Sequence, residues 1–129
     1  VCPWNGRFGR PTSDPAFAPR PGLGAPDPAA WLALSQPEFS ARLRGSPLKR
    51  ARRDGLARNA AVVAGNLRRS SDVPALAGAL LDDPSPVARA HAAWALGRIG
   101  TEPARRWLRQ ALALELEVDV RAEISAALS

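Results

Sequence analysis

The chain is short of the residues that build most enzyme active sites and most β-sheet cores. It has no Tyr, no Met, one Cys, one His and three Phe in 129 residues. Because sheets favour aromatic and β-branched residues, this scarcity argues against a large β-sandwich. A single Cys cannot form an internal disulfide, which fits a reducing compartment. A single His leaves no second imidazole for a metal site or a catalytic dyad.

Long hydrophobic runs and targeting signals are also missing from the sequence. No segment approaches the roughly 18 apolar residues that cross a bilayer. The N-terminus is rich in Pro and has no apolar core of a secretory signal. We therefore expect a cytoplasmic protein without membrane contact. Since the chain begins at Val and contains no Met, we expect it to be a piece of a longer protein.

Proline and glycine are concentrated at the N-terminus. Residues 1–28 hold seven Pro and four Gly, and this density predicts an irregular strap over residues 1–27 without room for helix. Phe8, Phe17 and Leu23 are candidates for pinning the strap onto a larger body. From residue 28 onward the composition is rich in Ala and Leu, which favours helices in close contact. The predicted fold class is all-α.

Capping residues divide this region into short helices. Asp27-Pro28, Ser35 and Ser46-Pro47 predict the first three starts, with the helix after Ser46-Pro47 stopping at Gly55. Linkers of two to five residues predict antiparallel neighbours. Further starts are expected at Ser71 or Asp72, Ser85, Thr101 and near Asp119. One predicted buried face comprises Leu56, Ala60, Val63 and Leu67.

These helices repeat at an offset of 32 residues. Residues 60–67 align with residues 92–99, Arg89 aligns with Arg121, and residues 95–96 align with residues 127–128. Ala-rich helices resemble one another at many offsets, but here the caps and glycines also fall in register. The period predicts helix pairs stacked as a short right-handed solenoid.

The net charge is confined to one segment. Residues 42–58 carry seven basic residues and one acid, which equals the chain's net charge of +6. A compact positive patch attracts polyanions, although runs of Lys and Arg are also common on solvated helix faces. Phosphate and sugar contacts with a shaped RNA are expected, rather than base reading. The candidate nucleic-acid-binding residues are Arg42, Arg44, Lys49, Arg50, Arg52, Arg53, Arg58 and Asn59.

Three segments in this order resemble the C-terminal part of the epoxyqueuosine reductase family. They are VCPWN at residues 1–5, RLRGSPLKR at 42–50 followed by GLARN at 55–59, and ARAHAAWALGRIG at 88–100. The last is similar to a HEAT-repeat helix. The resemblance covers essentially the whole chain. It implies a HEAT-like helical domain over residues 28–129, with a basic helix at 42–58, preceded by a strap that continues from an absent ferredoxin-like cluster domain.

The resemblance implies that the parent enzyme reduces epoxyqueuosine to queuosine in tRNA, using cobalamin and two [4Fe–4S] clusters. Cys2 matches the last ligand of a ferredoxin-type cluster motif. A four-iron cluster needs four ligands, so this chain alone is expected to hold no cofactor and to be inactive. The expected partners are tRNA and the rest of the parent chain, with this piece monomeric.

Other readings remain open at this point. A HEAT scaffold commonly serves as a protein–protein adaptor, and a DNA-repair glycosylase of HEAT-like fold would need an acid and aromatics in a basic groove. No catalytic residue is assigned. His91 is expected to be a partly buried helix residue bonded to a neighbouring loop. Asp82 and Asp83 are expected in a turn, and Glu115 and Glu117 on the surface.

Overall fold

The computed structural model describes residues 3–18 and 27–129, and within these ranges every regular element is a helix. The elements are α1 (Pro3–Phe8), η1 (Pro15–Phe17), α2 (Pro28–Leu32), α3 (Gln36–Arg42), η2 (Pro47–Ala51), α4 (Arg52–Leu67), η3 (Ser70–Asp72), α5 (Val73–Asp82), α6 (Pro86–Ile99), α7 (Glu102–Leu114) and α8 (Val118–Leu128). The η elements are short 3-10 helices.

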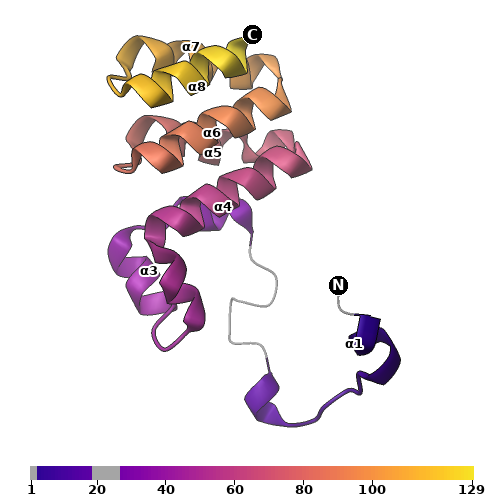
Figure 1. The fold of residues 1–129 in the computed structure, drawn as a ribbon. Helices are drawn as coiled ribbons and strands as arrows, with labels where there is room; N and C mark the ends of the chain where they lie inside the picture. The colour runs from indigo at the N-terminus through magenta and orange to yellow at the C-terminus, as the bar shows by residue number, and fades with distance from the viewer. Residues whose placement is uncertain (1–2, 19–26) are drawn as a thin grey trace.

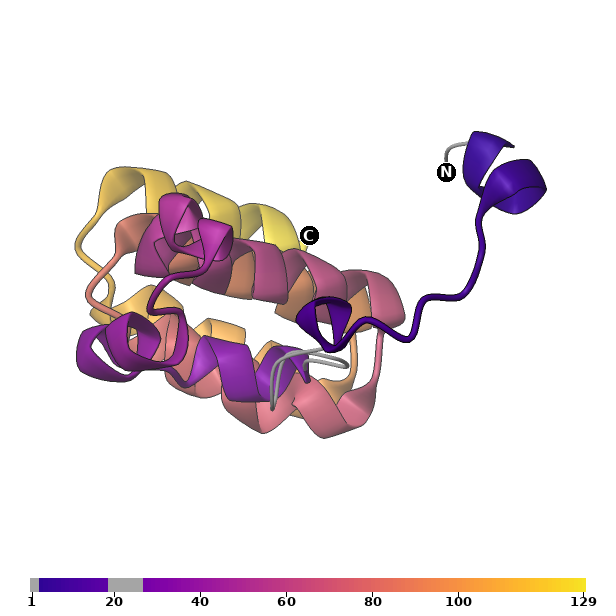
Figure 2. The ribbon, with the colours of Figure 1, turned by 90° about the horizontal axis from the view of Figure 1, so that it is seen from below.

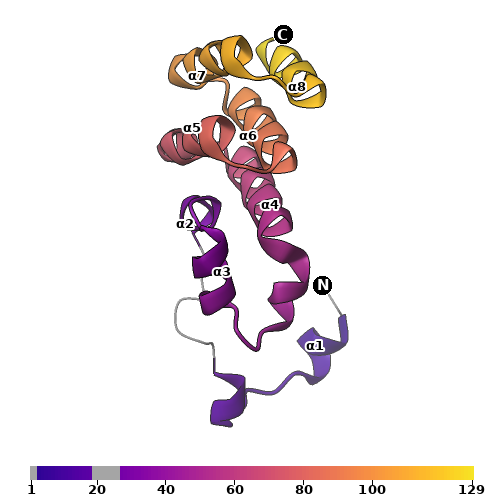
Figure 3. The same cartoon turned by 90° about the vertical axis from the view of Figure 1, so that its left-hand side faces the viewer.

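The helices form a stack of pairs in two layers. α4, α6 and α8 lie in one layer, and α2, α5 and α7 lie in the other (Figure 3). Within the stack α2 packs on α4, α5 on α6 and α7 on α8, while α4 contacts α6 and α6 contacts α8. Figure 1 shows the pairs rising from α4 to α8. The predicted all-α solenoid of short helix pairs is confirmed.

Several helix starts follow from the predicted capping residues. Asp27 Oδ1 accepts a hydrogen bond from the Ala29 N–H at 3.4 Å and opens α2. At the start of α3, the Ser35 N–H donates to Glu38 Oε2 at 2.8 Å and the Glu38 N–H donates to Ser35 Oγ at 3.4 Å, completing a capping box. These side chains satisfy backbone N–H groups that a helix start leaves without partners.

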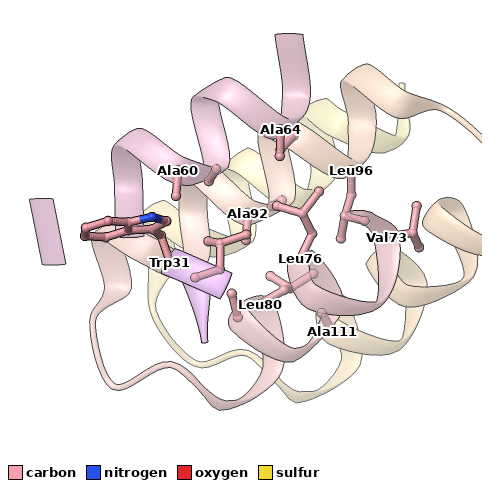
Figure 4. Packing of buried hydrophobic residues seen from close by; sticks show 14 of the residues in the cluster. Trp31, Ala60, Ala64, Val73, Leu76, Leu80, Ala92, Leu96 and Ala111 are labelled. Carbon is pink, nitrogen blue, oxygen red and sulfur yellow. The ribbon is translucent and has the colours of Figure 1, made fainter. Parts of the chain in front are cut away.

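The core fills the space between the two layers (Figure 4). Leu76 and Leu80 of α5, Leu96 of α6 and Ile124 of α8 are at most 1% exposed. Alanines on α4 and α6 complete this core and keep the helices close. The buried alanines include Ala61, Ala64, Ala92, Ala93 and Ala95.

Two glycines show that the 32-residue repeat of the sequence is also a repeat of the contacts between helices. A Cβ added to Gly65 would lie 3.0 Å from Ala95 Cα, and a Cβ added to Gly97 would lie 3.0 Å from Ala127 Cα. Gly65 precedes Gly97 by 32 residues, and Ala95 precedes Ala127 by the same number. α4 therefore meets α6 in the same way that α6 meets α8, which confirms the predicted period.

The predicted buried face of α4 is wrong in two positions. Val63 and Leu67 are 46% and 52% exposed, whereas Ala57, Ala61 and Ala64 are buried. The close approach of α4 to α6 leaves space only for small side chains. Val63 and Leu67 therefore lie on the outer side of α4, while Leu56 packs partly buried against the core.

Two boundaries also differ from the sequence prediction. The strap includes the short helix α1 and the turn η1, where the proline density predicted none. The basic helix does not stop at Gly55; a 3-10 turn ends at Ala51, and α4 continues through Gly55 to Leu67. Figure 2 shows α1 lying apart from the helical stack. Leu23, proposed to pin the strap, lies outside the described residues.

Candidate nucleic-acid interface

The basic segment, residues 42–58, lies at the N-terminal end of the helical stack. It runs from the C-terminal end of α3 through a turn and η2 into the first half of α4. Gly45 forms the turn with a positive φ of 68°, a conformation that glycine adopts without steric cost. Ser46 Oγ then accepts from the Leu48 N–H at 3.2 Å and starts η2. The segment thus bends twice within a few residues and brings its cations to one end of the molecule.

Arg53 does not belong to an exposed binding surface. Its side chain is 10% exposed and forms a bidentate ion pair with Asp83, which is 2% exposed; the Nη1–Oδ1 distance is 2.7 Å. Arg53 Nε also donates to the Leu34 carbonyl at 3.0 Å. The prediction that Arg53 contacts RNA is therefore corrected, because its guanidinium joins α4 to the ends of α2 and α5.

Similar arginines recur along the stack. Arg89, at the start of α6, donates to the Asp83 carbonyl at 2.9 Å and to Glu115 Oε2 at 2.7 Å. Arg121, at the start of α8, donates to the Leu112 and Glu115 carbonyls, both at 2.9 Å. Each arginine thus donates hydrogen bonds to backbone carbonyls at the C-terminal end of the helix with which its own helix is paired. Arg89 and Arg121 had been matched in sequence, but Arg53 stands outside the 32-residue spacing.

Glu115 has a structural role that the sequence did not reveal. It was expected to be a surface charge, yet its side chain is 8% exposed. The hydrogen bond from Arg89 lowers the pKa of Glu115 below its ordinary value, since that bond favours the charged carboxylate. Asp83 likewise lies in the predicted turn, but as the buried partner of Arg53. A partner about thirty residues away gives no local sequence signal.

Two residues of the segment contact polar or aromatic neighbours. The Arg42 guanidinium lies 5.0 Å from the centre of the Trp31 ring, in a cation–π geometry. Arg58 donates from both Nε and Nη2 to Asn59 Oδ1 at 3.1 Å. These contacts orient the two guanidinium groups while both residues stay exposed.

The remaining cations are exposed at η2 and its junctions. Arg44 follows α3, Lys49 and Arg50 lie on η2, and Arg52 begins α4; all four are exposed. Arg52 has φ 59° and ψ 164°, a backbone region occupied almost only by glycine and costly for other residues. The surrounding turn therefore holds Arg52 in a fixed position. Six of the eight predicted contacts are exposed cations grouped here: Arg42, Arg44, Lys49, Arg50, Arg52 and Arg58.

The other predicted sites are placed as follows. His91 Nδ1 lies 2.8 Å from the Val87 carbonyl of its own helix, rather than against a neighbouring loop. No group of three or more His, Cys, Asp or Glu able to hold a metal ion occurs within residues 3–18 and 27–129. Cys2, the predicted cluster ligand, lies outside these ranges. None of the helices described is both long and apolar enough to span a bilayer.

A family model for HEAT repeats matches residues 46–129. The chain belongs to the HEAT-repeat family. It is also 42% identical over 100 residues to an epoxyqueuosine reductase of Pseudomonas aeruginosa, a match that covers 78% of this chain and 27% of that protein. It is 30% identical over 125 residues to the epoxyqueuosine reductase of Bacillus cereus, covering 97% of this chain and 33% of the relative.

Solved structures agree with these relatives. A crystal structure of epoxyqueuosine reductase with a tRNA-Tyr epoxyqueuosine-modified tRNA stem loop superposes with a TM-score of 0.86 at 28% identity, covering 98% of this chain and 34% of that one. The epoxyqueuosine reductase from Bacillus subtilis gives a TM-score of 0.85 at 29% identity, covering 99% of this chain and 34% of that chain. The resemblance to this family is confirmed, and the chain spans about a third of its relatives' length.

Proposed function

We propose that this chain is the C-terminal, tRNA-binding helical part of an epoxyqueuosine reductase. The reduction of epoxyqueuosine to queuosine would be carried out by another part of the enzyme. The observation that carries the proposal is the TM-score of 0.86 over 98% of this chain to an epoxyqueuosine reductase solved with a tRNA stem loop. Arginine and lysine clusters supply the phosphate contacts that dominate RNA affinity.

The grouping of exposed cations supports a role in holding tRNA. Lys49, Arg50 and Arg52 are exposed, and no ion pair or hydrogen bond with another described residue engages their charged groups. A guanidinium can bind a phosphate with two hydrogen bonds, while an ammonium acts as a point charge. Backbone contacts to a folded RNA depend on its shape more than its sequence. The segment accordingly positions the tRNA and leaves chemistry to the rest of the enzyme.

The proposal also covers the cofactors and the domain that the rest of the parent enzyme would contribute. By resemblance it carries two [4Fe–4S] clusters and cobalamin, with Cys2 supplying one cluster thiolate and the remaining ligands coming from elsewhere. Residues 1–27 then connect the cluster domain to the HEAT-like domain of residues 28–129. The proposed setting is the cytoplasm, where tRNA is modified, and the proposed state is a monomer.

Charge reversal tests the proposal directly. The double variant Lys49→Glu with Arg50→Glu should weaken binding of the 129-residue chain to tRNA, on the order of tenfold or more at low salt. Its matched control is Arg105→Glu with Arg106→Glu, which makes the same charge change at two exposed residues of α7. Fluorescence anisotropy with labelled tRNA measures both affinities.

The control decides between a local site and a general field. If both pairs weaken binding equally, the attraction comes from the net charge and the assigned surface is wrong. If the chain binds no tRNA, or neither pair changes its affinity, the tRNA-binding role is contradicted and an adaptor role is favoured.

A further inference from the structure

The stretch of residues 44–55 carries exposed cations but has no apolar anchor of its own. Leu43, just before it, is fully buried, and Leu56, just after it, packs partly buried against the core. Every residue between them is at least partly exposed, and η2 buries none of its residues. Figure 3 shows the turn between α3 and α4 at the lower end of the stack. Because apolar burial is the main force that fixes a segment on a core, polar contacts must contribute to fixing this one.

Arg53 ties this stretch to the body of the stack. Its Nη1 donates to Asp83 Oδ1 at 2.7 Å, its Nη2 donates to Asp83 Oδ2, and its Nε donates to the Leu34 carbonyl at 3.0 Å. Leu34 lies between α2 and α3, and Asp83 lies between α5 and α6. One guanidinium therefore joins two linkers to the start of α4. Its bond to Leu34 closes a loop that contains α3, the Gly45 turn and η2.

Asp83 is itself held by further bonds. Its Oδ1 also accepts from the Ser85 N–H at 2.8 Å, and its carbonyl accepts from Arg89 Nη1 at 2.9 Å. The side chains of Arg53 and Asp83 are 10% and 2% exposed, so water competes little for their bonds and the low local dielectric strengthens them. The anchor point thus belongs to the interior of the stack, while the cations that it supports lie outside.

The residue before Arg53 has a strained backbone. Arg52 has φ 59° and ψ 164°, a conformation that persists in a non-glycine residue only where the surrounding structure imposes it. Arg52 follows η2 directly and begins α4, so the anchored Arg53 is part of the surroundings that impose this conformation. The direction in which Arg52 and η2 leave the stack is therefore coupled to the buried ion pair.

We propose that Arg53 and Asp83 are positioning residues, which hold the exposed cations of η2 and Arg52 in a fixed arrangement for tRNA. Neither residue touches the RNA in this account. A segment that is ordered before binding loses less conformational entropy on binding than a free segment does, and its affinity is higher for that reason. The inference rests on the proposed tRNA-binding function and adds to it the contact that pre-organises the binding segment.

Asp83→Asn separates positioning from charge. The substitution raises the net charge of +6 by one unit, so attraction by charge alone would strengthen tRNA binding. An amide has one acceptor oxygen in place of two, so it cannot receive both guanidinium bonds, and the buried charge of Arg53 loses its counter-ion. Positioning therefore predicts the opposite sign, a loss of affinity of roughly 3- to 30-fold. The matched control is Asp82→Asn at the exposed neighbouring residue, which should bind tRNA at least as well as the unaltered chain.

Arg53→Lys is a second variant that leaves the net charge unchanged. A lysine ammonium is a point charge without the planar fork of a guanidinium, so it cannot reproduce the bonds to both Asp83 oxygens and to the Leu34 carbonyl. Binding of tRNA should weaken here as well, whereas Arg106→Lys, at an exposed residue of α7, should leave the affinity unchanged. Thermal melting shows which variants are folded at the assay temperature. If Asp83→Asn is not folded, Arg53→Lys decides the question.

Fluorescence anisotropy with labelled tRNA over a range of salt concentrations measures the effect. Affinity should fall in both variants of the ion pair, while the slope of log K against log salt stays the same, because the same phosphates are contacted. A loss of stability alone would not change the affinity of a variant that is fully folded. The combination of weaker binding with an unchanged slope therefore reports positioning.

Other outcomes separate the two proposals. If the folded variants of Arg53 and Asp83 bind tRNA as the unaltered chain does, while Lys49→Glu with Arg50→Glu weakens binding, the positioning role is overturned and the tRNA-binding role stands. If Asp83→Asn binds more tightly with a slope steeper by about one unit, the released arginine has become a phosphate contact, and positioning is likewise overturned. An equal loss in the control variants would also overturn it. If the unaltered chain binds no tRNA, the proposed function itself fails.

Discussion

Replacing Gly97 by Ala should destabilise the stack, although alanine normally stabilises a helix. Gly97 lies within α6 and faces α8. An added Cβ would lie 2.8 Å from Ala127 Cβ, 3.0 Å from its Cα and 3.1 Å from its carbonyl oxygen. Two of these three atoms belong to the backbone, so no side-chain rotation relieves the clash. The two helices must move apart.

The magnitude follows from two opposing terms. Overpacking a tight contact costs about 1–3 kcal/mol, while exchanging Gly for Ala inside a helix gains about 0.5–1 kcal/mol. The midpoints of these ranges, about 2 and about 0.75 kcal/mol, give a net loss of about 1 kcal/mol in the free energy of unfolding. For a chain of this size, between the small and the larger domains for which the shift is known, each kcal/mol lowers Tm by roughly 4 °C. Urea unfolding followed by the far-UV circular dichroism of the helices measures the change.

Gly78 offers the matched control. It also lies within a helix, α5, but a Cβ added there would meet nothing within 4 Å. Gly78→Ala should therefore stabilise the chain by about 0.5–1 kcal/mol. If Gly97→Ala stabilised the chain as Gly78→Ala does, α6 and α8 would not meet at this glycine and the repeat register would be wrong.

Further predictions concern the buried ion pairs. Asp83→Ala should cost about 3–5 kcal/mol in the free energy of unfolding, because it leaves the Arg53 guanidinium buried without its carboxylate. Asp82→Ala, at the exposed neighbouring residue, should cost little. Equal losses in the two variants would contradict the buried ion pair. The hydrogen bond from Arg89 lowers the pKa of Glu115 in the folded chain. The stability that Glu115 contributes is therefore complete above its pKa in the unfolded chain, about 4.3. It is lost as the pH falls through the lower pKa of the folded chain. Glu115→Gln should remove that part of the acid dependence in urea titrations at several pH values, and an unchanged profile would refute the assignment.

Local signals predicted the helix starts and the repeat well. Asp27 and Ser35 cap the helices that their types indicated, since a cap is decided by residues within one turn. The 32-residue offset placed Gly65 and Gly97 in equivalent contacts. Such features depend on neighbouring residues or on self-similarity, and both are visible in a sequence.

Contacts between distant residues could not be predicted in the same way. Val63 was assigned to the buried face from the helical spacing of the apolar residues, but here close helix packing selects alanine and glycine. Arg53 was assigned to the RNA surface because it stands in a basic run. Its partner Asp83 lies 30 residues away, and only the folded stack brings them together.

The salt dependence of tRNA affinity tests the central claim most directly. If the six exposed cations of residues 42–58 all contact phosphates, the plot of log K against log salt should have a slope of about −4 to −5. Lys49→Glu with Arg50→Glu should flatten that slope by up to about two units, while Arg105→Glu with Arg106→Glu should leave it unchanged. A slope near zero for the unaltered chain, or equal flattening by both pairs, would contradict a tRNA-binding surface at this end of the stack.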